Sequence, residues 1–106
     1  MKAGKSSYMV NRQELAGIFV TVWAETAGSL NEHTLGKNYH RLEIEDNNHM
    51  VRCVWNFSFR QSALETQKWV MKQIAGEILE DKKLNVQHVI EMVAKEMPLL
   101  DPLFGE

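Results

Sequence analysis

The feature that most constrains the fold is an alternation of polar and apolar residues on both sides of Asn47-Asn48. Tyr39–Asp46 and His49–Phe59 each alternate with a period of two residues, the period of a β-strand with one buried face. Asparagine tolerates the positive φ angles that a two-residue type I′ turn requires. The pattern therefore predicts an antiparallel β-hairpin whose turn is Asn47-Asn48.

A two-residue turn also decides which residues of the two strands lie opposite each other. It pairs Ile44 with Val51, Leu42 with Cys53, and His40 with Trp55. With these pairs, the apolar residues of both strands share one face. A slip of one residue would move every apolar residue of one strand to the solvent face. We therefore expect Ile44 opposite Val51.

A helix is predicted before the hairpin. Asn11 can act as its N-cap with Glu14 as the capping-box partner, and Gly28 is suited to end it. Between them, apolar residues recur at helical spacing: Leu15, Ile18, Phe19 and Val22. The predicted helix spans residues 11–28.

Two further helices are predicted after the hairpin. Ser62 with Glu65 forms a second capping box, and we expect this helix to continue to about residue 83. Its predicted buried stripe is Leu64, Gln67, Val70, Met71, Ile74, Ala75, Ile78 and Leu79. Asn85 begins the last helix and Pro98 ends it. Its predicted buried face is Val86, Val89, Ile90, Val93 and Met97.

The whole chain of 106 residues has the size of one domain. Residues 1–9 are small, polar and basic, so we expect a disordered leader followed by a single α+β domain over residues 10–106. The predicted order is a helix, an antiparallel β-hairpin and two helices packed on one face of the small sheet. Asn31–Leu35 could add a short third strand.

Charge and composition exclude several classes of function. The net charge is −2, which disfavours a nucleic-acid partner because such proteins carry a surplus of positive charge. A weaker hypothesis would use Tyr39, Arg41, Arg52 and Arg60 to bind nucleic acid. No apolar run approaches the ~20 residues of a membrane span. The single cysteine is typical of a reducing compartment, so we expect a cytoplasmic protein without membrane association.

One candidate ligand site lies on the apolar face of the hairpin. The predicted register places His40 across from Trp55, where an imidazole needs a hydrogen-bond partner or water. These two residues could form the rim of a pocket between sheet and helices. Cys53 lies on the same face, and an apolar environment makes a thiol inert.

Trp69 is the main candidate for an interaction surface. At helical spacing it lies opposite the predicted buried stripe, near Gln73 and Gly76. A glycine there would let another backbone approach closely. Either another helix of the chain or a second molecule could cover Trp69. The apolar tail, with Leu100 and Phe104, also needs to pack on something.

Catalytic motifs are missing from the sequence. There is no glycine-rich phosphate loop, no serine elbow and no histidine opposite Cys53, and the four histidines show no metal-ligand spacing. We therefore expect no metal and no cofactor, and nothing in the sequence argues for an enzyme. The favoured function is a small interaction or regulatory protein that acts through protein–protein contacts as a homodimer. The alternative is a small-molecule binding domain with the His40–Trp55 pocket.

Overall fold

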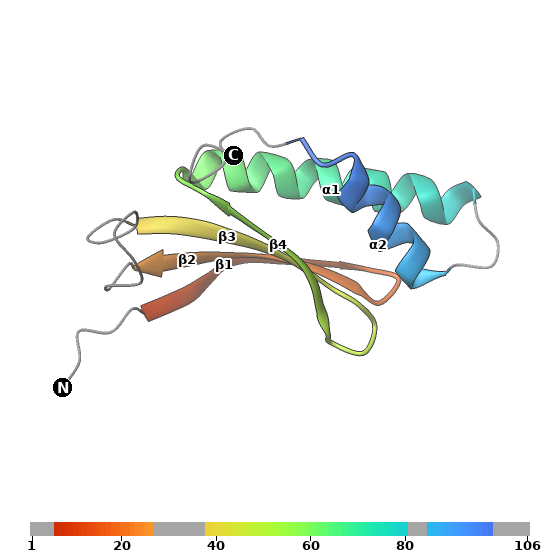
Figure 1. Cartoon of the computed structure of the whole chain (residues 1–106), viewed down its shortest axis with the longest axis horizontal. Coiled ribbons are helices and arrows are strands. Elements are labelled where there is room, and N and C mark those ends of the chain that lie inside the picture. Colours follow the sequence, from red (N-terminus) through yellow and green to blue (C-terminus); the bar gives the residue numbers. More distant parts are fainter. Residues whose placement is uncertain (1–5, 27–37, 81–84, 99–106) are drawn as a thin grey trace.

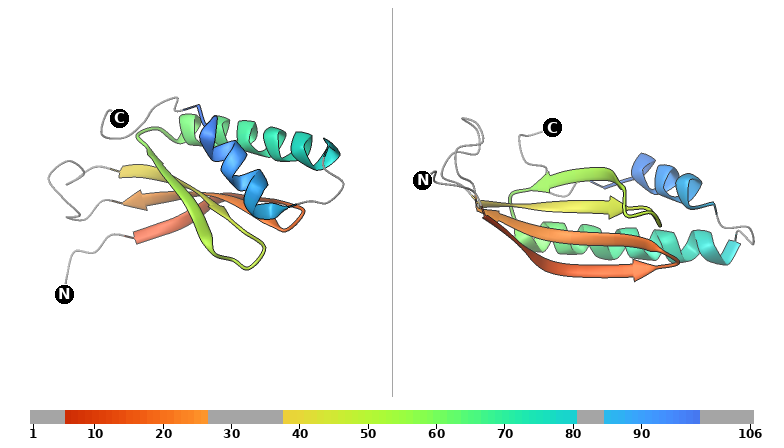
Figure 2. Two further views of the ribbon diagram at one scale, coloured as in Figure 1. Left: turned by 45° about the vertical axis from the view of Figure 1, so that its right-hand side comes forward. Right: turned by 90° about the horizontal axis from the view of Figure 1, so that it is seen from below.

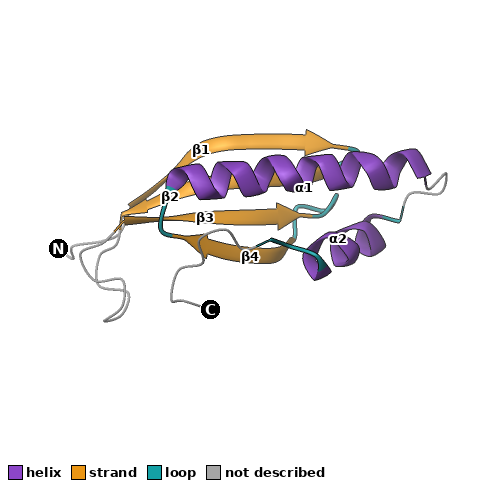
Figure 3. Cartoon of the chain, turned by 90° about the horizontal axis from the view of Figure 1, so that it is seen from above, coloured by secondary structure: helices purple, strands orange, loops and turns teal. Residues whose placement is uncertain are grey.

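A four-stranded antiparallel sheet lies under two helices in the computed structural model, which describes residues 6–26, 38–80 and 85–98 (Figure 1). The elements are β1 (Ser6–Leu15), β2 (Ile18–Thr26), β3 (Asn38–Glu45), β4 (Val51–Phe57), α1 (Arg60–Glu80) and α2 (Val86–Lys95). The strands pair in the order β1-β2-β3-β4, so β1 and β4 form the edges of the sheet. Both helices lie on the same face of it (Figures 2 and 3). The predicted α+β class is confirmed, with four strands in the described ranges rather than two or three.

The predicted N-terminal helix is wrong, because these residues form a β-hairpin of β1 and β2, the first hairpin of the chain. Leu15 pairs with Ile18 around Ala16 and Gly17, whose φ angles are 54° and 83°. Positive φ at both central residues is the mark of a type I′ turn. The Glu14 carboxylate accepts a hydrogen bond of 2.7 Å from the backbone N–H of Gly17. Because β1 begins at Ser6, residues 6–9 belong to the sheet rather than to a leader.

From Cys53 to Phe57 the β3–β4 hairpin has the predicted faces but a different register, whereas Val51, predicted on the apolar face, lies opposite Glu45 and is 48% exposed. Ile44 lies opposite Cys53, Leu42 opposite Trp55, and His40 opposite Phe57. The predicted pairing of Ile44 with Val51 is therefore wrong, since all three partners on β4 are shifted by two residues. A shift of two residues preserves the side on which each side chain points.

A longer turn and an extra residue on β4 each contribute one residue to this shift. His49, not an asparagine, takes the positive φ, at 64°. Its N–H donates to the carbonyl oxygen of Asp46 at 3.0 Å, and the N–H of Asp46 donates to the carbonyl oxygen of Met50 at 2.9 Å. The turn thus contains three residues, Asn47–His49, and resembles the type I turn with a following left-handed residue. Arg52 is an extra residue on β4, because Glu45 pairs with Val51 while Ile44 pairs with Cys53.

The two helices largely follow their sequence signals. α1 begins at Arg60, two residues before the predicted N-cap Ser62, and the N–H of Ala63 donates to the carbonyl of Phe59. Contrary to the prediction, Leu79 lies outside the core, with 86% of its surface exposed. α2 is confirmed: the side chain of its N-cap Asn85 accepts a hydrogen bond of 3.1 Å from the N–H of His88.

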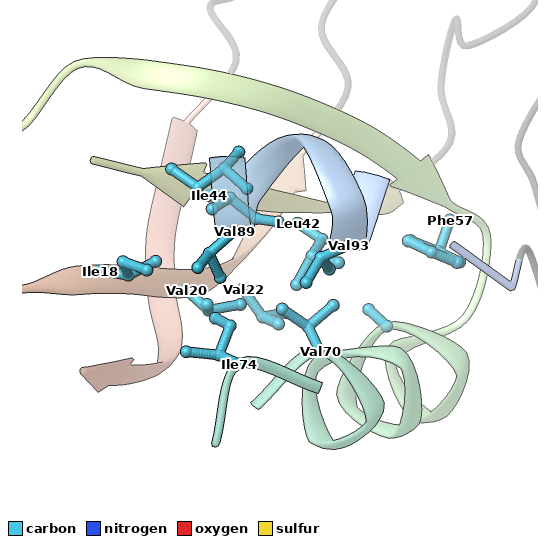
Figure 4. Close-up of a cluster of buried hydrophobic side chains, with 12 residues drawn as sticks. Ile18, Val20, Val22, Leu42, Ile44, Phe57, Val70, Ile74, Val89 and Val93 are labelled. Atoms are coloured by element: carbon cyan, nitrogen blue, oxygen red, sulfur yellow. The ribbon is translucent and has the colours of Figure 1, made fainter. Parts of the chain in front are cut away.

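The hydrophobic core fills the space between the sheet and the two helices. Figure 4 shows side chains from β2, β3, β4 and both helices pointing into it. Its fully or almost fully buried members include Ile18, Val20, Val22, Leu42, Ile44, Phe57, Val70, Ile74, Val89, Ile90 and Val93. Most of the sheet residues come from the central strands β2 and β3. This core leaves the edge strands and the far face of the sheet for other contacts.

Asp46 fixes the turn of the second hairpin and joins it to α2. One carboxylate oxygen accepts hydrogen bonds from the N–H groups of Asn48 and Met50, at 2.9 and 3.0 Å. The other accepts from Arg52 at 2.8 Å and from Gln87 of α2 at 3.1 Å. These bonds, that from Met50 foremost, lower the pKa of Asp46 from 3.8 to about 2.

Candidate interaction surfaces

The sheet face turned away from the helices carries a layer of aromatic and charged side chains. The guanidinium of Arg12 lies 4.4 Å from the centre of the Phe19 ring, and that of Arg41 lies 5.6 Å from the centre of the Trp23 ring. The indole N–H of Trp23 donates to Glu43 at 3.2 Å. These distances allow cation–π attraction, which adds to the packing of the layer.

Carboxylates neutralise the arginines of this layer. Arg41 forms ion pairs with Glu25 and with Glu43, the second at 2.7 Å, and Arg12 lies 3.4 Å from Glu45. The nucleic-acid hypothesis named Arg41 together with Tyr39, Arg52 and Arg60. Tyr39 is buried, Arg52 pairs with Asp46, and Arg60 donates to the hydroxyl of Tyr8 at 2.7 Å. Apart from Arg60, these residues therefore offer little of the surplus positive charge that phosphate groups need.

The β4 edge exposes apolar side chains. Met50, Val51 and Val54 are 56%, 48% and 47% exposed. Val54 lies opposite Glu43, on the margin of the open sheet face. An edge strand presents unpaired backbone N–H and C=O groups, which another strand can satisfy. Apolar side chains beside such groups add to the attraction for a second strand.

The β1 edge is different, because it borders a hollow. The pairing of β1 with β2 shifts between Met9 and Asn11, which breaks the regular edge. Beyond this point, a hollow of about 480 Å³ lies between β1 and α1. Its lining combines amide, charged and apolar side chains: Asn11, Gln13, Gln61, Gln67, Glu65, Lys68, Leu64 and Met71. A second hollow, lined by Lys68, Trp69, Met71 and Lys72, shares Lys68 and Met71 with it.

Trp69 is covered in part by its own chain. It is half-buried, packs against the hydrophobic core and lines a small crevice between α1 and α2. The other residues of this crevice are Gln73, Glu77, Met92, Val93 and Glu96. Gly76 is exposed, and among the described residues a Cβ there would meet no atom within 4 Å, so this part of the chain shows no close approach at Gly76. Leu100 and Phe104 lie outside the described residues.

His40 and Trp55 share the helix-facing side of the sheet without facing each other across the strands. The His40 Nδ1 atom is buried and has no hydrogen-bond partner among the described residues. Burial, with a smaller effect of the nearby Arg60, lowers the pKa of His40. Neither His40 nor Trp55 lines any of the three hollows above. The pocket between them stays a prediction.

Cys53 lies on the same side of β4 and is half-buried. Burial raises the pKa of its thiol, against a smaller opposite effect of Arg52. A raised pKa reduces the thiolate that would act as a nucleophile. In the ranges that the structure describes, no three His, Cys, Asp or Glu side chains gather closely enough to hold a metal ion. Of the described helices, none has the length and apolarity to cross a membrane.

Sequence reasoning missed the aromatic and arginine layer and the hollow beside β1. Both depend on β1 and β2, over which the helical spacing predicts a helix. The missed signal is the alternation Ile18, Val20, Val22 and Ala24 in a segment rich in β-branched residues.

Comparisons with protein-family models, curated proteins and solved structures found no match to this chain.

Proposed function

We propose that this protein is a protein–protein interaction module that forms a homodimer through the edge of β4. The observation that carries the proposal is the exposure of Val51 and Val54 on that edge strand and of Met50 just before it. Two copies of β4 running antiparallel would satisfy each other's outward backbone groups. Such a contact uses the same surface on both copies and closes as a two-fold dimer, the commonest small assembly.

The β4 edge suits this role better than the β1 edge. From Cys53 to Phe57, β4 pairs with β3 without a shift of register, so its outer edge is regular as well. Each edge strand contains one register shift, β1 between Met9 and Asn11 and β4 at Arg52. The regular part of β1 borders a hollow, which favours β4 as the edge for a second copy.

The oligomeric state of two matched variants tests the proposal. We expect the wild type to sediment with twice the 12.2 kDa mass of one chain. Val54→Lys should give a monomer, because a lysine on an edge strand opposes pairing. Leu79→Lys changes an apolar residue that is exposed even more, near the end of α1, and should remain dimeric. A monomeric wild type, or a dimeric Val54→Lys variant, would overturn the proposal.

A further inference from the structure

We propose that the hollow between β1 and α1 binds an extended peptide segment of a partner, which adds as a strand to the β1 edge. This site goes beyond the proposed homodimer, because β1 and β4 are opposite edges of the sheet. Peptides often bind in this way, with main-chain hydrogen bonds for affinity and neighbouring side-chain pockets for specificity.

The hollow has the size and walls that such a peptide needs. Its volume of about 480 Å³ falls within the range of ligand sites, roughly 300–1,000 Å³. The regular part of β1, Asn11–Leu15, begins just after the register shift, and Asn11 and Gln13 from this part line the hollow. The available edge and the hollow therefore coincide.

The opposite wall supplies apolar contacts along the direction of the peptide. Leu64 and Met71 both line the hollow from α1. They are seven residues apart, which corresponds to roughly 10 Å along a helix. That distance is the length of about three residues of extended chain. The hollow thus accommodates a short extended segment with apolar side chains directed toward α1.

The polar lining matches the groups of a peptide backbone. The amides of Asn11, Gln13 and Gln61 each offer both donors and acceptors, as a peptide group does. Gln13 donates to Asn11 at 2.8 Å, and Gln61 donates to Glu65 at 2.9 Å, so each amide retains further hydrogen-bonding capacity. Because these amides offer uncharged donors and acceptors, they favour a neutral peptide backbone over an ionic ligand.

The neighbouring hollow indicates an acidic residue in the peptide. Lys68 and Lys72 border it and are exposed, and neither forms an ion pair within the described part of the chain. Glu65, the one carboxylate of the first hollow, already accepts the hydrogen bond from Gln61. The charge of the combined surface is therefore complementary to a carboxylate near Trp69. The expected ligand is an extended segment with apolar residues and an acidic residue.

Selection of peptides tests this inference directly. A library of random linear peptides of about twelve residues, displayed on phage, is selected on the wild-type protein, and an enriched peptide is synthesised. We expect its affinity for Leu64→Glu to be about tenfold weaker than for the wild type, because a carboxylate replaces the apolar wall. Leu79→Glu carries the same change on the same helix outside the hollow and should bind like the wild type.

Two further measurements keep the test decisive if Leu64→Glu folds poorly. Gln13→Lys alters an exposed lining residue and should also weaken binding. Hydrogen exchange should show slower exchange of backbone amides in residues 11–15 when the peptide is bound, because strand addition protects them. Val54→Lys should bind the peptide normally even though it loses the dimer, which separates this site from the proposed function. No enriched peptide, undiminished binding to both hollow variants, or unchanged exchange would each overturn the inference.

Discussion

The side-chain amide of Gln67 on α1 donates a hydrogen bond of 2.9 Å to the backbone carbonyl oxygen of Val20 on β2. The same nitrogen lies 3.4 Å from the carbonyl oxygen of Asn11, next to the register shift in β1. Only 4% of Gln67 is exposed. One buried amide thus connects the long helix to both strands of the first hairpin.

Replacement of Gln67 by leucine should destabilise the protein. The change removes the donor and leaves buried carbonyl groups with fewer partners, which costs about 1–3 kcal/mol of unfolding free energy. Urea denaturation measures the loss. Gln61→Leu, at an exposed position of the same helix, serves as the control and should change the unfolding free energy by less than about 0.5 kcal/mol. Equal stability of the two variants would contradict the role of Gln67.

Two substitutions in the turn at Ala16-Gly17 should change the stability of the protein in opposite directions. Ala16→Asn should stabilise the protein by a few tenths of a kcal/mol, because asparagine suits the first position of a type I′ turn. Gly17→Ala should destabilise it by about 1–2 kcal/mol, because a side chain is strained at a φ of 83°. Its Cβ would also lie 3.2 Å from the Cβ of Asn47.

The same two variants distinguish a hairpin from a helix. Inside a helix, alanine is the most favourable residue, and Gly→Ala would stabilise by about 1 kcal/mol. Both effects would then have the opposite sign. Thermal melts of the two variants therefore decide which structure residues 11–26 adopt.

Asp46 predicts a loss of stability in acid. Its folded-state pKa of about 2 lies below the ordinary value of 3.8, so the ionised form stabilises the fold. This contribution is complete above about pH 4 and disappears as the pH falls from about 4 to about 2. Asp46→Asn should be less stable than the wild type at neutral pH and should lose less stability over that interval. Denaturation curves at several pH values measure this, with Glu91→Gln on the exposed side of α2 as the control. If the Asp46→Asn variant lost as much stability over that pH interval as the wild type does, this result would contradict the role of Asp46.

Trp69 should contribute to folding more than to self-association. Truncation of a fully buried tryptophan costs roughly 3–5 kcal/mol, and for the half-buried Trp69 we expect about 2 kcal/mol from Trp69→Ala. The packing of Trp69 against the hydrophobic core supplies this stabilisation. A thermal melt should show a lower midpoint, while sedimentation should show the oligomeric state of the wild type. An unchanged midpoint together with a changed oligomeric state would instead place Trp69 in an interface.

The N-terminal third of the fold could not be read from helical spacing alone. Leu15, Ile18, Phe19 and Val22 fit one face of a helix, but residues 18–24 also alternate with a period of two. Short apolar segments often satisfy both periods. The β-branched residues of this segment and the glycine at the turn, Gly17, favour strands. Here, strand pairing and burial of β2 between two neighbours outweighed the capping signals at Asn11 and Glu14.

Where one signal dominated, the prediction was closer to the structure. Asn85 caps α2 as expected, and Val89, Ile90 and Val93 are buried. For β3 and β4 the alternation predicted the faces, while the register depended on the left-handed conformation of His49, which no pattern in the sequence signals. Helical spacing marks Trp69 as unusual, but the hollow that adjoins its own depends on β1, which helical spacing does not predict.

The sequential strand order has a consequence for synthesis on the ribosome. Each strand pairs with its neighbour in the chain, so all four strands leave the ribosome before any residue of α1. The sheet side that carries Val20, Val22 and Leu42 then lacks its helical cover until residues 60–80 emerge. An uncovered apolar sheet is prone to aggregate. Nascent chains that end before α1 should therefore be the species most dependent on chaperones.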